Sequence, residues 1–141
     1  MIKIKRIENF QEFDKLADKL LDEYDSKNNV NYNFKQFVFT ASENDEIVGI
    51  LTGFSYYAEV QINNLVVLEK YRGQGIGSKL IKQVENYFAD KGFNNINLTT
   101  NAFQAPEFYT KCGFELEFVR NNKENPKLTK YFFVKYFCAE Q

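Results

Sequence analysis

The chain has 141 residues, of which 44% are hydrophobic and 26% are charged, as expected for one soluble globular domain. Eighteen basic and nineteen acidic residues give a formal net charge of −1, which argues against non-specific binding to nucleic acid. The chain contains no histidine, so a histidine-activated nucleophile and a histidine-bound zinc are both excluded.

The sequence shows no pattern of a membrane span or signal peptide, and no cysteine spacing of a metal site or disulfide framework. No apolar run approaches the roughly 18 residues of a membrane span, and the amino terminus MIKIKRIENF does not have the pattern of a signal peptide. Cys112 and Cys138 lack the spacing of metal ligands, and two cysteines do not make a disulfide framework. We therefore expect a single cytoplasmic domain over residues 1–141, with no bound metal and with no membrane or nucleic-acid partner.

The first predicted elements are a strand and a helix. Residues 2–7, IKIKRI, alternate apolar and basic side chains, which predicts a half-buried strand. Asn9 followed by Glu12 predicts a capping box, and apolar residues at helical spacing continue the helix to about residue 24. The polar segment DSKNNVNYNF over residues 25–34 predicts a loop.

Three strands are predicted next. Residues 36–42 and 46–57 flank the turn residues Glu43, Asn44 and Asp45, which predicts a hairpin. Residues 58–69, AEVQINNLVVLE, predict a further strand, the fourth in the predicted order. Its alternation breaks at residues 65–67, which is consistent either with a bulge there or with burial on both faces.

The carboxyl-terminal half predicts, in order, a helix from Ile76 that stops near Gly92, a strand over residues 96–100, a short helix that starts near Pro106 and ends before Gly113, and a last hairpin of residues 114–119 and 130–137. Strands and helices in this order predict a mixed α/β domain.

The segment YRGQGIGSKLI over residues 71–81 carries three glycines at alternate positions, just ahead of a helical pattern. The first turn of a helix has unpaired N–H groups that attract phosphate, and glycines leave those groups uncovered. A tight strand-to-helix connection would give the same string. The candidate phosphate ligands are Arg72, Gly73, Gln74, Gly75, Ile76, Gly77 and Ser78.

Two common phosphate motifs fit this segment poorly. The P-loop needs four residues between its outer glycines and a lysine after the second, and Gly73 and Gly77 meet neither condition. The dinucleotide motif G-x-G-x-x-G would need its third glycine at Ser78, and it belongs in the first βαβ unit of a domain. A nicotinamide cofactor is therefore not expected.

R-G-Q-G-I-G over residues 72–77 resembles the pyrophosphate-binding motif R/Q-x-x-G-x-G/A of the GNAT superfamily of N-acetyltransferases. The family's second motif, A-x-x-x-Y-x-x-x-G-F, matches APEFYTKCGF over residues 105–114. The two motifs occur in the family's order and the short chain is similar to small single-domain bacterial members. The resemblance implies acetyl-coenzyme A as cofactor and a mixed, mostly antiparallel sheet that is flanked by helices and splays between its fourth and fifth strands.

The resemblance also implies where the cofactor binds. Its pyrophosphate would lie on the N–H groups of residues 74–78, and its pantetheine arm would pair with the backbone of the fourth predicted strand. Many members contact the arm through an asparagine at the position of Ala102, and Asn101 is the neighbouring residue. The expected ligands outside the glycine segment are Val66, Val67, Leu68, Asn101, Pro106, Phe108 and Tyr109.

Catalytic roles are implied in the same way. Tyr109 would protonate the departing thiolate, and the Val67 N–H group would stabilise the oxyanion. Glu59 has the placement of the general base in histone-acetylating members, whereas other members use water or an amine that loses its proton in solution. Aromatic side chains that could surround an amine acceptor are Tyr24, Tyr32, Phe34, Tyr56 and Tyr57.

The expected reaction is transfer of an acetyl group to the primary amine of a small molecule such as an amino acid, a polyamine or an amine-bearing antibiotic. A second interpretation is acetylation of a protein lysine or amino terminus. A third is that the chain is a non-catalytic regulatory domain that binds acyl-CoA. The protein is expected to be a monomer or a homodimer.

Overall fold

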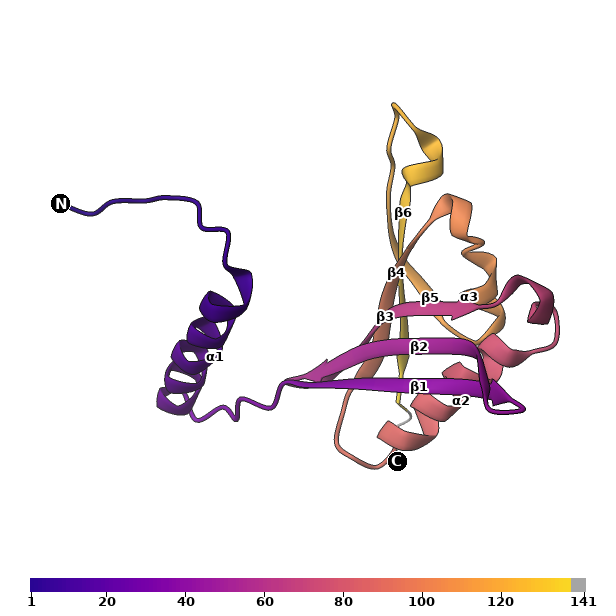
Figure 1. The fold of residues 1–141 in the computed structure, drawn as a ribbon, viewed down its shortest axis with the longest axis horizontal. Helices are drawn as coiled ribbons and strands as arrows, with labels where there is room; N and C mark the ends of the chain where they lie inside the picture. The colour runs from indigo at the N-terminus through magenta and orange to yellow at the C-terminus, as the bar shows by residue number, and fades with distance from the viewer. Residues whose placement is uncertain (138–141) are drawn as a thin grey trace. The chain divides into compact units, whose positions relative to one another are not determined.

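The computed structural model describes residues 1–137, and the chain divides into two units, Met1–Asn33 and Phe34–Gln141 (Figure 1). Each unit is described by itself below. Cys138 lies outside the described residues. No helix within residues 1–137 is both long enough and apolar enough to span a membrane.

The amino-terminal unit contains one helix, α1 (Phe10–Lys27). Asn9 is its N-cap: the Asn9 side-chain oxygen accepts from the Glu12 N–H at 3.3 Å, and the Asn9 amide donates to the Glu12 carboxylate at 3.0 Å. The predicted capping residues are therefore confirmed. The helix continues three residues beyond the predicted end at residue 24 and stops at Asn28, whose N–H donates to the Asp25 carbonyl.

The strand predicted over residues 2–7 is wrong, because residues 1–9 form no strand. The alternation of side chains alone does not make a strand, which needs a partner for its backbone N–H and C=O groups. The amino-terminal unit contains α1 and no strand, so residues 2–7 have no strand within this unit with which to pair.

The second unit is built on a sheet with the order β1-β2-β3-β4-β6-β5, in which only β3 and β4 pair in parallel (Figure 1). The strands are β1 (Lys35–Glu43), β2 (Glu46–Tyr56), β3 (Glu59–Val67), β4 (Asn95–Asn101), β5 (Glu115–Arg120) and β6 (Lys130–Tyr136). The helices are α2 (Ile76–Phe88) and α3 (Glu107–Lys111), with short 3-10 turns at Glu69–Tyr71, Ala102–Gln104 and Pro126–Leu128. The mixed α/β fold predicted from the sequence is confirmed.

Both predicted hairpins are present. β1 and β2 are joined by Asn44 and Asp45, which have φ values of 51° and 65°. A two-residue turn with positive φ at both positions matches the twist of antiparallel strands, and asparagine and aspartate tolerate that conformation best after glycine. The second hairpin pairs β5 with β6.

The irregularity in β3 lies at Asn63 and not at residues 65–67. Thr52 of β2 pairs with Asn64 and Gly53 pairs with Ile62, so Asn63 is an extra residue with no partner. Residues 65–67 pair regularly with residues 49–51. The bulge shifts the inward-facing positions from even to odd numbers, and this shift is what breaks the alternation in the sequence.

Gly53 is required opposite this bulge. A Cβ atom added at Gly53 would overlap the Gln61 carbonyl oxygen and crowd the Phe37 ring. The backbone of β2 and the bulged strand therefore approach each other more closely than any side chain allows.

β3 and β4 pair over three residue pairs only, Glu59–Asn95, Val60–Ile96 and Gln61–Asn97. Beyond Gln61, β3 stays paired with β2 to its end, while β4 stays paired with β6. The two strands leave their last pair in different directions (Figure 1). They are the fourth and fifth strands of the prediction, so the predicted splay is confirmed, and the bulge at Asn63 stands where it begins.

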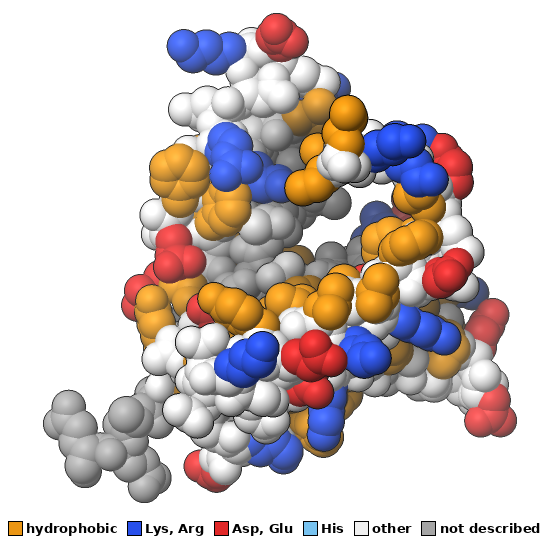
Figure 2. All heavy atoms as spheres, turned by 90° about the vertical axis from the view of Figure 1, so that its left-hand side faces the viewer, with side chains coloured by type: hydrophobic (Ala, Val, Ile, Leu, Met, Phe, Trp, Pro, Cys, Tyr) orange, Lys and Arg blue, Asp and Glu red, His pale blue; other side chains and the backbone are white. Residues whose placement is uncertain are grey.

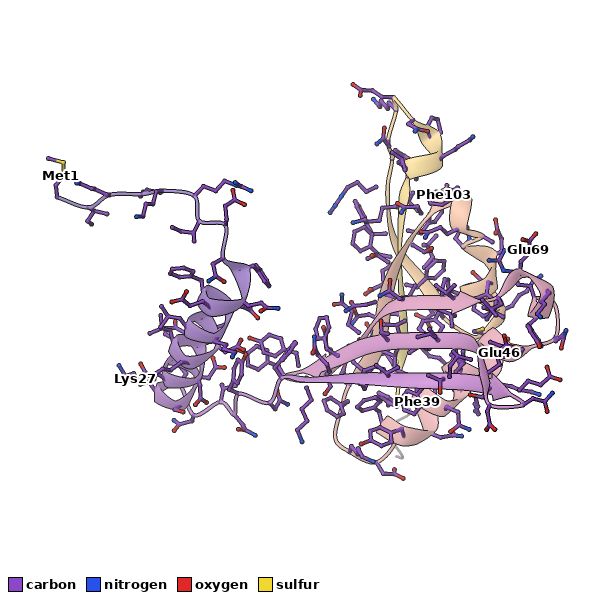
Figure 3. The ribbon with its side chains drawn as sticks, viewed as in Figure 1. Met1, Lys27, Phe39, Glu46, Glu69 and Phe103 are labelled. Carbon is purple, nitrogen blue, oxygen red and sulfur yellow. The ribbon has the colours of Figure 1, made fainter. Side chains whose placement is uncertain are left out.

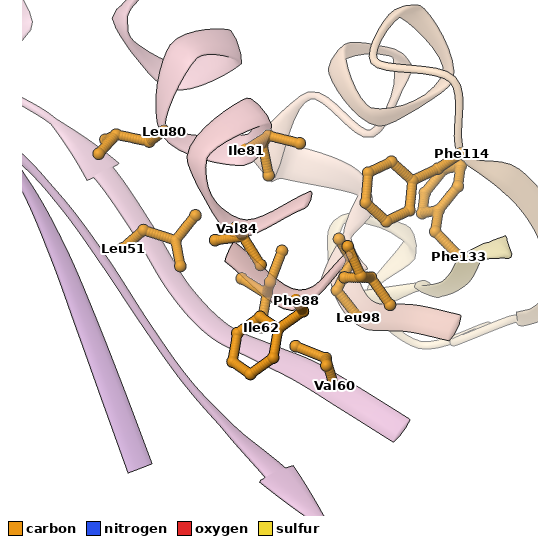
Figure 4. Packing of buried hydrophobic residues seen from close by; sticks show 11 residues of the cluster. Leu51, Val60, Ile62, Leu80, Ile81, Val84, Phe88, Leu98, Phe114 and Phe133 are labelled. Atoms are coloured by element: carbon orange, nitrogen blue, oxygen red, sulfur yellow. The ribbon is translucent and has the colours of Figure 1, made fainter. Parts of the chain in front are cut away.

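The core lies between the sheet and α2 (Figure 4). Each large apolar side chain that is fully buried there contributes about 1.5–3 kcal/mol to stability. α2 buries Leu80, Ile81, Val84 and Phe88 on one face, and its Tyr87 side chain is half exposed. The buried members are Leu51, Val60, Ile62, Leu80, Ile81, Val84, Phe88, Ile96, Leu98, Phe114 and Phe133.

Candidate functional site

The amino terminus of α2 is open to a ligand. Gly75 is the N-cap with a φ of 79°, and Gly73 has a φ of 78°; a Cβ atom at either position would meet nothing within 4 Å. Within the described chain no side chain caps this helix, and its first turn holds no acidic residue. The N–H groups in the first turn of this 13-residue helix are thus left uncovered.

Arg72 ties the glycine segment to the end of β3. Its Nε atom donates to the Val67 carbonyl oxygen at 2.9 Å. A guanidinium group has five N–H donors, so four remain after this bond. Arg72 therefore combines an anchor on the strand with a charge beside the α2 amino terminus.

The edge of β3 that faces the splay offers backbone groups of alternate residues. The Leu68 N–H donates to the Val48 carbonyl at 2.9 Å, which continues the ladder between β3 and β2. Backbone groups in an antiparallel ladder alternate between the two sides, so Val66 and Leu68 face β2, and Leu65 and Val67 face the splay. Of the three residues predicted to pair with a ligand, only Val67 presents its N–H to the open side. Leu65 was not among the predicted ligands.

A cleft runs along this edge from the glycine segment to α3. It consists of two adjoining hollows of about 410 and 540 Å³, which share Leu65, Val67, Arg72 and Phe108. The first is completed by Tyr71, Gly73, Gly75, Ile76, Gly77 and Ser78. The second is completed by Val66, Phe103, Gln104, Ala105 and Tyr109. Phe103 lies in the short turn after β4 (Figure 3).

Gly77 has a different role from the other two glycines. A Cβ atom at this position would lie 3.1 Å from the Phe108 ring. α2 and α3 therefore approach each other at Gly77, and the glycine serves packing between helices and not a special backbone conformation.

Asn101 is engaged away from the cleft. Its backbone N–H and its side-chain amide both donate to the Gln104 side-chain oxygen, at 2.9 and 3.2 Å, and it does not line either hollow. Gln104 does line the cleft, and no sequence motif singled it out. Pro106 is the buried N-cap of α3, and neither it nor Gln74 lines the cleft.

Tyr109 closes the far end of the cleft. Its ring packs against Phe108, Phe114 and Phe133, with centroids 5.1, 6.0 and 5.7 Å away. Burial raises the pKa of the Tyr109 phenol above its ordinary value, and the charge of Cys112 when ionised raises it further. The phenol is therefore protonated at neutral pH, and Tyr109, which lines the cleft, carries a hydroxyl that can donate a hydrogen bond or a proton.

Glu59 does not share a cavity with Tyr109. It lies at the paired end of β3, where its two carboxylate oxygens accept from the side chains of Asn95 and Asn97 at 3.1 and 3.3 Å. Its neighbour Val60 is fully buried under α2, so Glu59 points to the opposite face of the sheet. It lines a separate cavity of about 300 Å³ that has no lining residue in common with the cleft.

The aromatic residues predicted to hold an acceptor are dispersed. Phe34 packs against Tyr56 with ring centroids 5.8 Å apart, and Tyr56 against Tyr57 at 3.9 Å. This group does not line the cleft, although Tyr56 pairs directly with Glu59 across β2 and β3. Tyr24 and Tyr32 belong to the amino-terminal unit, where the Tyr32 hydroxyl donates to Asp18 at 2.6 Å.

Charge on the surface is mixed in sign. On the face drawn in Figure 2, basic and acidic side chains are interspersed, and neither forms a large patch. The electrostatic features that distinguish the cleft are therefore local ones: the α2 amino terminus and Arg72.

Known structures share the fold of this chain. An acetyltransferase from Bacillus cereus ATCC 14579 has a TM-score of 0.77 and 28% identity, with 96% of this chain and 98% of that chain covered. An aminoglycoside 6'-N-acetyltransferase complexed with coenzyme A has a TM-score of 0.65 and 18% identity, with 100% and 99% covered. The ribosomal-protein-S18-alanine N-acetyltransferase from Escherichia coli has a TM-score of 0.67 and 17% identity, with 75% and 72% covered.

No curated protein matches the chain in sequence. The model of the Acetyltransferase (GNAT) family matches residues 2–114, which include the glycine segment, the open edge of β3 and Tyr109. By this match the chain belongs to the GNAT acetyltransferase family.

Proposed function

We propose that this protein is an N-acetyltransferase that moves an acetyl group from acetyl-CoA to the primary amine of a small molecule. The observation that carries the proposal is the continuous cleft from the uncapped amino terminus of α2, along the open edge of β3, to the Tyr109 ring. The coenzyme-A-bound aminoglycoside acetyltransferase shares the fold over the whole chain and supports the choice of ligand.

The parts of the cleft fit the parts of acetyl-CoA in order. The pyrophosphate needs anion donors without side chains in the way, which Gly73 and Gly75 provide together with Arg72. The pantetheine arm carries amides that can pair with a free strand edge, and the N–H groups of Leu65 and Val67 face that edge. No charged side chain other than Arg72 lines the cleft within the described residues, as a neutral arm requires.

When bound, acetyl-CoA supplies a thioester carbonyl for attack by an amine. In our proposal a backbone N–H on the cleft side of β3, from Leu65 or Val67, donates to the carbonyl oxygen, and the cleft holds the reacting groups in one place. Tyr109 donates its hydroxyl proton to the sulfur as it leaves. An unperturbed thiol has a pKa of about 8.5 and a tyrosine of about 10. The raised pKa of Tyr109 keeps the proton on the phenol until that moment and makes its transfer more uphill.

Attack on the thioester also requires that the amine lose a proton. Glu59 lies in a cavity separate from the one that Tyr109 lines, with both carboxylate oxygens bonded to asparagine side chains. We therefore propose that water takes the amine proton, or that the amine attacks after it has lost its proton in solution.

The test is release of free CoA thiol from acetyl-CoA in the presence of amino acids, polyamines, aminoglycosides and short lysine peptides. Binding of acetyl-CoA is measured in parallel by calorimetry. Release with one small-molecule class supports the proposal and names that class. Release with lysine peptides alone would replace the small molecule by a protein acceptor. Binding without any release would favour a regulatory domain, and failure to bind acetyl-CoA would refute the proposal.

A further inference from the structure

Tyr109 lies on α3, a helix of only five residues. A helix this short is not stable in water by itself, so its position depends on the contacts that hold its ends. The carboxyl end of α3 is closed by a Schellman motif, in which the Phe114 N–H donates to the Tyr109 carbonyl at 3.0 Å. The second bond of the motif runs from the Gly113 N–H to the Thr110 carbonyl, also at 3.0 Å. The backbone of Tyr109 is therefore part of this helix end.

The Lys135 side chain rests against the same helix end. Its Nζ atom donates to the carbonyl oxygen of Cys112, the C-cap of α3, at 2.9 Å. A Cβ atom added at Gly113 would lie 3.0 Å from this Nζ atom, and the Phe114 ring centroid lies 5.9 Å from it. Lys135 thus lies beside three successive residues, 112–114, that end the helix.

Glu85 of α2 holds the Lys135 side chain in place. Lys135 follows the buried Phe133 by two residues on β6, so its side chain points to the sheet face that α2 covers. There its Nζ atom pairs with the Glu85 Oε1 atom at 2.5 Å. The two side chains are 32% and 13% exposed, so water screens this pair less than it screens a pair on the open surface. Lys135 therefore links the end of α3 to the middle of α2.

Two further contacts bring α3 against α2. The Phe108 ring packs at Gly77, and the Cys112 Sγ atom lies 3.8 Å from the Ser78 Oγ atom. Ser78 lines the cleft, and it also lines a hollow of about 210 Å³ that the Glu85–Lys135 pair lines. The contact between the two helices thus extends from the cleft to the ion pair.

We propose that Lys135, held by Glu85, is a positioning residue for Tyr109. The inference rests on the proposed acetyltransferase function, in which the Tyr109 hydroxyl gives its proton to the departing sulfur. Lys135 fixes the Cys112 carbonyl, and the Cys112 N–H donates to the Tyr109 carbonyl at 3.1 Å. A reacting group that is misplaced by about 1 Å can cost on the order of a hundredfold in rate. Loss of this hold should therefore lower turnover and leave cofactor binding intact.

Hydrogen exchange in the cofactor-free protein measures the hold on α3 without any reaction. The reporters are the N–H groups of Cys112 and Phe114, which both bond to the Tyr109 carbonyl. Lys135→Met should speed their exchange by about tenfold, as expected when a hydrogen bond from a charged donor is lost. Nuclear magnetic resonance resolves the two groups individually.

Kinetics test whether the hold acts through Tyr109. The assay is release of CoA thiol at saturating acetyl-CoA, with the best acceptor among the amino acids, polyamines, aminoglycosides and lysine peptides named above. Lys135→Met should lower kcat by about tenfold, while the Kd of acetyl-CoA changes less than about twofold. In a Tyr109→Phe background the same change should lower kcat by less than about twofold, because the hydroxyl that Lys135 positions is then absent.

Lys82→Met is the matched control. Lys82 pairs with the other Glu85 oxygen at 3.5 Å, and among the described residues it makes no hydrogen bond to α3. Hydrogen exchange and kcat should both stay as in the wild type. If Lys135→Met fails to fold because Glu85 has lost its partner, Lys135→Met combined with Glu85→Gln removes that charge as well, and the same results are expected of it.

The possible results distinguish this inference from the proposed function. Unchanged hydrogen exchange in Lys135→Met, or equal losses of kcat with and without the Tyr109 hydroxyl, would overturn the inference and leave the acetyltransferase intact. Wild-type turnover by Tyr109→Phe would do the same, because no proton donor would then need positioning. Absence of CoA release by the wild type with every amine, or absence of acetyl-CoA binding, would overturn the proposed function and the inference with it.

Discussion

Gly75→Ala tests whether the amino terminus of α2 is the anion site. The φ of 79° at Gly75 is left-handed, where an alanine costs about 1–2 kcal/mol, and nothing lies within 4 Å of the added Cβ. The penalty is therefore backbone strain without a clash. A strain of that size should lower the melting temperature by about 3–6 °C in a domain of this length.

The control is Gly92→Ala. Gly92 has a φ of 88° and equally open surroundings, but it lies after α2 and away from the cleft. Both variants should lose similar stability by thermal denaturation. Only Gly75→Ala should weaken acetyl-CoA, by about tenfold if the loop gives up roughly 1.4 kcal/mol of binding energy. Calorimetry measures this difference. If the two variants bind acetyl-CoA equally well, the phosphates do not rest on this loop.

Three further variants address the chemistry, the loop and the fold. Tyr109→Phe should lower kcat by about a hundredfold with acetyl-CoA affinity unchanged, and Tyr87→Phe, outside the cleft, should match wild type. Because the pKa of Tyr109 is raised, wild-type kcat should persist through the ordinary titration range of tyrosine near pH ~10 and fall only above it; a fall at lower pH would mean that another group titrates. Arg72→Ala should weaken acetyl-CoA about tenfold in dilute buffer and less in high salt, and a salt-independent loss would contradict a phosphate contact. Gly53→Ala should cost about 2–4 kcal/mol in urea denaturation because its Cβ overlaps the Gln61 carbonyl, and a neutral result would refute the bulge geometry.

Local sequence signals predicted most of the elements. Asn9 and Glu12 gave the start of α1, and Asn44 and Asp45 gave the turn between β1 and β2, because both signals depend on side chains that bond to, or tolerate, one local backbone conformation. The strand predicted over residues 2–7 failed because pairing is not a local property.

The site, too, was predicted where local motifs specify it and missed where it depends on contacts that are not local. The glycine segment and Tyr109 line one cleft as expected, since each belongs to a motif with its own backbone requirement. The roles of Leu65 and Gln104 depend on the direction of a backbone edge and on a turn after β4, which single-residue patterns do not encode. Glu59 was expected at the cleft by its resemblance in placement to the base of histone-acetylating members, whereas its strand position turns it to the other face.

The bulge at Asn63 makes the length of β3 matter more to the cleft than several of its side chains do. Removing this one residue would bring Ile62 and Asn64 into continuous register with β2, so that β3 could run straight and continue to pair with β4 past Gln61. Deletion of Asn63, with every motif residue intact, would thus close the gap between β3 and β4 and block ligand access. Asn63 itself lines neither hollow, so its deletion would act on the cleft without removing any residue that lines it.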